Sequence, residues 1–139
     1  MKIKIHALLL SAILLLSGCS ASTPDIAVES DYDIDFTVLS STVVYAEVYN
    51  MLSSPDDYLG KTVKISGTYT SNTYEDTGIT YHFVIISDAT ACCAQGLEFI
   101  WSGAYPEDGA AIEICGTYKT YLEDGCEYCY IDTENVTVK

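Results

Sequence analysis

The apolar residues of this chain follow two different spacings, and each spacing predicts a different kind of element. Between residues 42 and 52 they recur three and four positions apart, which gathers them on one side of a helix. These residues are Val44, Val48, Met51 and Leu52. Ser41 or Thr42 can cap the start of the helix, and Ser53-Ser54-Pro55 ends it. Because its β-branched residues weaken the helix, we expect it to pack against a sheet.

After the helix, alternating or continuous short apolar runs predict five strands. The second strand is an almost unbroken apolar run, which is typical of a strand buried on both faces. Gly67 and Gly116 lie inside the first and fourth strands, where they allow a bend. The expected bounds are 62–69, 81–87, 97–101, 111–121 and 127–132, and Val136 and Val138 extend the last strand.

One helix followed by five strands predicts a mainly β fold. The glycines inside two strands favour a small five-stranded barrel of the oligonucleotide/oligosaccharide-binding (OB) type, preceded by one short helix. The connection at 102–109 is too short for the helix that most OB-folds carry between strands three and four. In this chain the helix precedes strand one instead. In OB order, strands three and five lie side by side and parallel.

Short motifs support this fold by resemblance. Asp88-Ala89-Thr90 closes the second strand, Trp101 ends the third, and Ile131-Asp132 lies late in the fifth. This arrangement resembles the bacterial OB-fold family of small exported proteins. Residues 92–99, Cys-Cys-Ala-Gln-Gly-Leu-Glu-Phe, are similar to a segment of uncharacterised bacterial lipoproteins. The resemblance covers about residues 43–138. Neither group implies a catalytic residue set, and the two adjacent cysteines depart from the pattern of the first.

The first 19 residues resemble a bacterial lipoprotein signal peptide. Lys2 and Lys4 form a basic start, residues 7–16 are apolar, and Leu-Ser-Gly-Cys at 16–19 is similar to a lipobox. A transmembrane helix is the alternative, but an apolar run of about ten residues is short of the roughly 20 that a bilayer requires. We therefore expect cleavage before Cys19, attachment of acyl chains such as palmitate to this residue, and anchoring on the extracytoplasmic face of a bacterial membrane.

These features divide the chain into three regions. Residues 1–18 form the signal peptide, 19–41 the lipidated cysteine with an acidic tether, and 42–139 the barrel domain. Carboxylates in the tether repel one another and keep it extended. Apolar alternation at residues 32–38 leaves an edge strand as the alternative. The aspartates at 31, 33 and 35 resemble the start of an EF-hand calcium loop, but the glycine and the glutamate that such a loop requires are absent.

The charge balance excludes one class of partner. The chain has 20 acidic residues and a net charge of −14, and its six basic residues are all lysines. Removal of the signal peptide would leave four of those lysines. Nucleic-acid binding requires cationic side chains that displace counterions from phosphates, so it is not expected. Docking on anionic lipid headgroups is disfavoured for the same reason, whereas a cation or a basic partner is compatible.

Five cysteines follow the lipobox, and four of them lie at the starting ends of the expected third and fifth strands. Cys92 and Cys93 precede the third strand, and Cys126 and Cys129 open the fifth. Because these strands are neighbours in OB order, we expect the two pairs to meet at one end of the barrel. A disulfide, a zinc site of four thiolates, and buried reduced thiols are the alternatives. Cys115 is expected to stay free.

Candidate chemistry outside the cysteines is sparse. His82 is the only histidine after the signal peptide, and a structural role on a strand is favoured over a ligand or base. No Ser-His-Asp set and no phosphate loop can be assembled. The aromatic residues could form a platform on which a ligand stacks. The alternative is that they pack on one another across neighbouring strands and have only a structural role. The platform would consist of Trp101, Tyr128 and Tyr130, with Tyr105, Tyr118 and Tyr121 nearby.

Together these observations favour a non-catalytic binding or structural module of the cell envelope. It would need no cofactor, and an envelope protein or a small ligand would be its partner. The alternative is a thiol-dependent metal-binding or redox lipoprotein that uses the cysteine cluster, with zinc as the metal.

Overall fold

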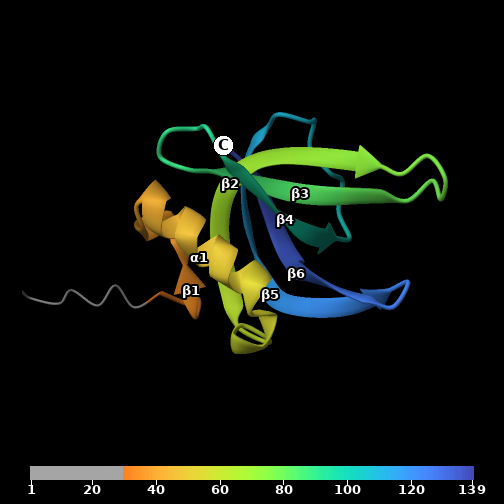
Figure 1. Cartoon of the computed structure of the whole chain (residues 1–139). Coiled ribbons are helices and arrows are strands. Elements are labelled where there is room, and N and C mark those ends of the chain that lie inside the picture. Colours follow the sequence, from red (N-terminus) through yellow and green to blue (C-terminus); the bar gives the residue numbers. More distant parts are fainter. Residues whose placement is uncertain (1–29) are drawn as a thin grey trace, which may run out of the picture.

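The structure, a computed structural model, describes residues 30–139, so the signal peptide and Cys19 lie outside the described residues. The described chain is mainly β and contains one α-helix, as the sequence predicted (Figure 1). Within residues 30–139, none of the helices has the length and apolarity that a membrane span requires. The elements are β1 Ile34–Asp35, η1 Phe36–Val38, α1 Ser41–Ser53, η2 Pro55–Asp57, β2 Thr62–Thr73, β3 Thr80–Ser87, β4 Ala94–Trp101, β5 Ala111–Glu123 and β6 Cys126–Val138.

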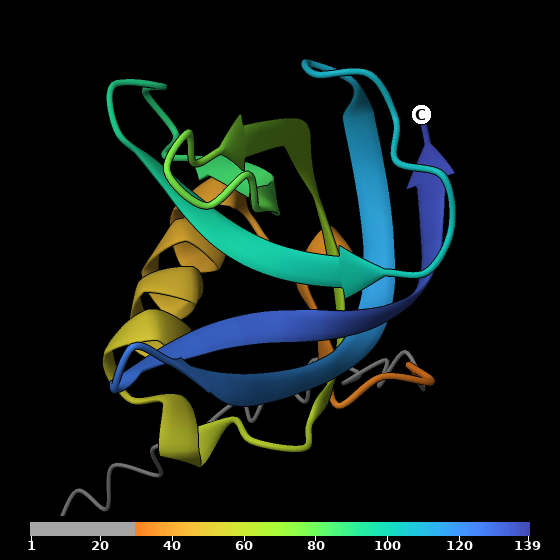
Figure 2. The same ribbon diagram turned by 90° about the vertical axis from the view of Figure 1, so that its right-hand side faces the viewer.

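The strands form one six-stranded sheet in the order β1-β2-β3-β4-β6-β5, and β2 also pairs with β5. The β1–β2 and β4–β6 pairs are parallel, and the other pairs are antiparallel. The predicted neighbourhood of the third and fifth long strands is therefore confirmed. Figure 2 shows the sheet curving around the core, with α1 along one side.

The strand β2 exchanges one partner for another along its length. Residues 62–68 pair with β5, and residues 68–73 pair with β3. Gly67 lies where the exchange occurs, and a Cβ at this position would be 2.5 Å from the Ile85 carbonyl oxygen. The close approach of β3 therefore requires a residue without a side chain, which accounts for the bend that the sequence predicted here.

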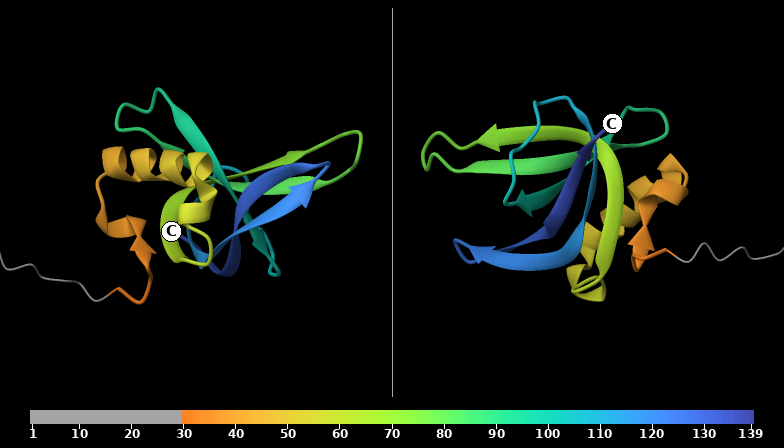
Figure 3. Two further views of the ribbon diagram at one scale, coloured as in Figure 1. Left: turned by 60° about the horizontal axis from the view of Figure 1, so that its bottom comes forward. Right: turned by 180° about the vertical axis from the view of Figure 1, so that it is seen from behind.

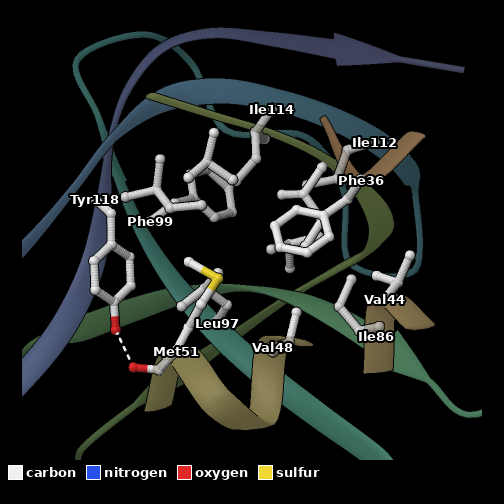
Figure 4. Packing of buried hydrophobic residues seen from close by; sticks show 14 of the residues in the cluster. Phe36, Val44, Val48, Met51, Ile86, Leu97, Phe99, Ile112, Ile114 and Tyr118 are labelled. Carbon is white, nitrogen blue, oxygen red and sulfur yellow. Dashed lines mark hydrogen bonds between the residues drawn. The ribbon is translucent and has the colours of Figure 1, made fainter. Parts of the chain in front are cut away.

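The core lies between α1 and the concave side of the sheet (Figure 4). Val44, Val48 and Met51 from the helix are buried, as their spacing predicted. The fully buried Tyr118 of β5 donates its hydroxyl to the Met51 carbonyl oxygen at 2.6 Å. This bond satisfies a carbonyl near the end of the helix and connects α1 to β5 across the core.

Three local expectations differ from the structure. The residue before the helix is Ser40, one position earlier than the expected cap, and its side chain makes no capping bond. Leu52 is exposed because it lies outside the face that packs on the sheet. Strand β3 is not fully buried on both faces, since only Val84 and Ile86 are buried and the alternate side chains of the strand interior are half-buried.

The expected tether is wrong for its last part, and the edge-strand alternative describes it better. Ile34 and Asp35 pair with β2, and Phe36 is buried in the core at 2% exposure. Asp33 accepts bonds from the backbone N–H and the hydroxyl of Thr62, both at 2.8 Å, and the first of these is the main cause of its lowered pKa. Its carboxylate thus attaches the segment to β2, and mutual repulsion does not keep this part of the chain extended.

Candidate functional site

A set of partly buried polar groups lies in a groove between two hairpin turns. One turn joins β2 to β3, the other joins β5 to β6, and Figures 1 and 3 show both on the side away from α1. Two adjoining hollows of about 390 and 290 Å³ share four of its residues: Tyr81, Glu98, Tyr121 and Glu123. We call this region the tyrosine groove and define it by these four residues together with Tyr74 and Tyr128.

Glu98 is a carboxylate at the floor of the groove. It lies on β4 and is only 9% exposed. Burial raises its pKa above the usual 4.5, and the negative charge of Glu123 acts in the same direction. The Tyr121 hydroxyl donates to Glu98 Oε2 at 2.9 Å and partly opposes this shift. The groove therefore holds a carboxyl group whose protonation changes at a higher pH than that of an exposed glutamate.

A second tyrosine–glutamate pair lies beside the first. The Tyr81 hydroxyl donates to Glu123 Oε1 at 2.6 Å, and this bond is the main cause that raises the pKa of Tyr81 to about 12. Burial followed by the bond to Glu98 also raises the pKa of Tyr121. Both phenols are therefore fixed donors at neutral pH. They orient the two carboxylates without neutralising them.

The aromatic rings of the groove contact one another across strands. Tyr121 stacks on Tyr128 with ring centroids 5.6 Å apart, and Tyr130 meets the edge of Tyr121 at the same centroid distance. Tyr74 and Tyr81 form an edge-to-face pair at 5.5 Å. Two of the three residues of the predicted platform, Tyr128 and Tyr130, thus belong to one aromatic cluster, which also packs across strands.

Trp101 does not join that cluster, and this part of the expectation is wrong. Its ring meets the edge of Tyr105, with centroids 6.0 Å apart. Tyr105 in turn stacks on His82 at 3.5 Å, and the Tyr69 hydroxyl bonds to His82 Nδ1 at 2.7 Å. Burial lowers the pKa of His82. His82 on strand β3 is therefore held by Tyr69 of β2 and Tyr105 of the β4–β5 connection, in agreement with the structural role that was favoured for it.

The groove carries negative charge that no described cation balances. All four lysines in the part of the chain that the structure describes lie elsewhere. Lys64 and Lys139 pair with Glu113, and Lys119 pairs with Asp132 at 2.5 Å. Lys61 lies over the ring of Tyr58. Glu98 and Glu123 therefore have tyrosine hydroxyls as their partners, and a cationic group could pair with either carboxylate.

The four cysteines that were expected to meet do not do so. All five described cysteines are free thiols. Cys92 and Cys93 lie in the β3–β4 connection beside Asp88, whereas Cys126 and Cys129 lie at the start of β6 (Figure 1). The β4–β6 ladder begins only at Glu98 and Tyr130, and before that point β6 pairs with β5. The strand order was right, but the starting ends of the two strands diverge.

The residues that sequence reasoning missed are polar groups scattered over three strands and a turn. Tyr74, Tyr81, Glu98 and Glu123 come from different elements, and each is unremarkable in its own strand. The one available signal was the alternation of aromatic residues beside short glycine turns. No family model, curated protein or solved structure matches this chain. The geometry of the groove is therefore the main basis for a functional proposal.

Proposed function

We propose that this protein is a lipid-anchored, extracytoplasmic binding module without catalytic activity, and that its tyrosine groove binds amine-bearing ligands of the cell envelope. The observation that carries the proposal is the pair of unneutralised carboxylates, Glu98 and Glu123, oriented by tyrosine hydroxyls inside an aromatic groove.

The strand order supports an OB-like barrel as the scaffold. Because β2 pairs with both β3 and β5, the ladder runs from β2 through β3, β4, β6 and β5 and returns to β2. This is the order of a five-stranded OB barrel, with β1 as an added edge strand. Ligands of such barrels bind over the second and third strands, between the first and the last hairpin loops. In this chain that position coincides with the tyrosine groove.

The chemistry of the groove favours a cation with apolar surface. An ammonium group over a tyrosine face gains about 0.5–2 kcal/mol, and a hydrogen bond to a carboxylate adds about 1.5–3 kcal/mol. Sugar rings carry C–H groups that pack on aromatic faces, so an amino sugar or a lysine-bearing peptide satisfies both requirements. Phosphates and other anions would be repelled by Glu98 and Glu123.

The side chains that line the groove are suited to binding. Within the described residues, no serine or cysteine lines either of the two hollows. The imidazole of His82 borders one hollow, but its Nδ1 is bonded to Tyr69. The carboxylates that remain are suited to holding a cationic group.

Binding to the groove is tested with a glucosamine tetramer, which carries amines, and its N-acetylated counterpart, which does not. We expect calorimetry on the complete chain in detergent to show binding of the first and at least tenfold weaker binding of the second. Glu123→Gln should weaken binding about tenfold, because it removes a charge and keeps the shape. Glu127→Gln, which removes the same charge outside the groove, is the control. Equal binding of both sugars, or equal losses in both variants, would contradict the proposal.

The same measurement has an expected pH dependence. The ionised form of Glu98 attracts an ammonium group, and protonation removes that attraction. Because burial raises its pKa, affinity should begin to fall at a pH above the range of an exposed glutamate, whose pKa is 4.5. Glu98→Gln should remove this part of the profile.

The anchor is tested at Cys19, which supplies the only thiol directly after the Ser-Gly pair of the lipobox. We expect Cys19→Ala to leave the membrane fraction or to accumulate as an uncleaved precursor, because no acyl chain can be attached. Fractionation and immunoblotting measure both results. Cys126→Ser is a matched control that should fractionate like the unaltered chain. Normal processing and membrane retention of Cys19→Ala would show that the lipid anchor is wrong.

A further inference from the structure

The connection between β3 and β4 brings three metal-ligating groups together outside the tyrosine groove. Asp88, Cys92 and Cys93 each direct one ligand atom to the same place, and these three atoms lie within 4.8 Å of one another. Both cysteines are exposed free thiols. The Cys92 and Cys93 sulfurs are 3.6 Å apart, and Cys92 Sγ is 3.3 Å from Asp88 Oδ2.

Two of the three separations, both from Cys92 Sγ, are close to the edges of a small tetrahedral coordination shell, and the third is within 4.8 Å. Zinc binds thiolate sulfur at about 2.3 Å and carboxylate oxygen at about 2.0 Å. At tetrahedral angles, two sulfur ligands are then about 3.8 Å apart, and a sulfur and an oxygen about 3.5 Å apart. The observed distances are within a few tenths of an ångström of both values, so small side-chain movements would admit the ion.

The backbone explains why two adjacent cysteines can face the same ion. Neighbouring residues of a regular strand point to opposite faces, which makes a Cys-Cys pair a poor ligand set there. Here the chain bends before β4 begins, and Ala91 adopts a left-handed conformation with φ of 55°. The Asp88 N–H donates to the Cys93 carbonyl at 2.9 Å and closes the connection. Both sulfurs consequently lie on the side of Asp88.

The two oxygens of Asp88 have separate partners. Oδ1 accepts the backbone N–H groups of Cys92 and Cys93, at 2.9 and 3.3 Å. Oδ2 faces the Cys92 thiol and the Thr90 hydroxyl. The first oxygen therefore fixes the carboxylate, and the second is available as a ligand.

We propose that Asp88, Cys92 and Cys93 form a three-ligand site for a thiophilic divalent cation of the zinc class, with the fourth coordination position open to solvent. The site differs from a four-thiolate centre, because Cys126 and Cys129 take no part in it. Its exposure lets metal exchange with the surroundings, and the acidic chain attracts cations. The site is separate from the tyrosine groove and does not depend on amine binding there.

The test is a titration of the complete, reduced chain in detergent with Zn²⁺ against a chromophoric chelator. We expect one equivalent to bind, and Cd²⁺ to produce the ultraviolet charge-transfer band of metal thiolates. Cys92→Ser and Cys93→Ser should each weaken binding at least tenfold, and Asp88→Asn should weaken it less. Cys126→Ser is the matched control, an exposed cysteine outside the site, and should bind like the unaltered chain. Thermal unfolding checks that each variant is folded.

A second measurement needs no variant. Bound Zn²⁺ should protect Cys92 and Cys93 from alkylation, as read by mass spectrometry, and leave the reactivity of Cys126 unchanged. Four outcomes would each overturn the proposal: no binding at micromolar Zn²⁺, protection only at other cysteines, unaltered binding by the double Cys92→Ser/Cys93→Ser variant, or loss of binding in Cys126→Ser.

Discussion

A Gly116→Ala variant should lose about 1–3 kcal/mol of its free energy of unfolding, because the sheet has no space for a side chain at this position. Strand β5 is paired on both sides here, with Val63 of β2 and Thr133 of β6. A Cβ at 116 would overlap the Asp132 carbonyl oxygen and would lie 2.8 Å from Ile131 Cγ2. Neither paired strand can move aside without breaking its hydrogen bonds.

Glycine is required here because a side chain would not fit. A special backbone conformation is not the reason, since the φ angle of Gly116 is not positive. It lies at a register shift, where Cys115 pairs with Asn135 and Gly116 with Thr133. Such a bulge bends the pair and increases its twist. An alanine side chain would therefore disturb the bend of β5 and β6 through which the sheet curves around its core.

Urea denaturation of Gly116→Ala beside Gly96→Ala measures this effect. In Gly96→Ala the new Cβ would be 3.3 Å from Ile85 Cδ1, the end of a flexible side chain that can shift. We expect that control to change the free energy of unfolding by less than about 1 kcal/mol, since a strand tolerates alanine better than glycine. Similar unfolding midpoints for the two variants would show that β5 and β6 have room to separate.

The parts of the fold that the sequence predicted are those whose side chains alternate between core and solvent. The helix and the five long strands were found because Val44, Val48 and the apolar residues of β5 recur at regular intervals. The outer ends of β2 and β5 were missed. Residues 71–73 are polar and mostly exposed, and they form a strand because they pair with β3. The sequence therefore contains no alternation of apolar residues that would predict this end of β2.

The tyrosine groove could not be predicted from the periodicity of side chains, because its residues meet through long-range pairing of strands. Glu98 meets Tyr121 only because β4 and β5 both flank β6, and that adjacency depends on long-range register. A single carboxylate in an apolar strand such as β4 gives no indication of its partner. The predicted meeting of the two cysteine pairs failed for a related reason. Their strands were placed correctly as neighbours, but the sequence does not show where along its length a parallel ladder begins.

A Phe36→Ala variant is expected to lose about 3–5 kcal/mol of its free energy of unfolding. Such a loss would show that the segment around Phe36 belongs to the folded domain and is not a tether. The ring is 2% exposed and packs in the same core cluster as Val44 and Ile112. Alanine would leave a cavity that the surrounding helix and strands can fill only in part. A chain that begins at Ser41 should lose at least as much, since it also loses the pairing of Ile34 with β2.

Val38→Ala is the matched control, because Val38 belongs to the same short helix but is 64% exposed. Its substitution should change the free energy of unfolding by less than about 0.5 kcal/mol. Thermal and urea unfolding of both variants and of the shortened chain provide the comparison. If Phe36→Ala unfolds like Val38→Ala and the shortened chain still unfolds cooperatively, the acidic segment contributes no core and acts as the tether that its composition suggested. The expected difference would instead place the start of the folded domain before Phe36, with any tether confined to residues nearer the lipobox.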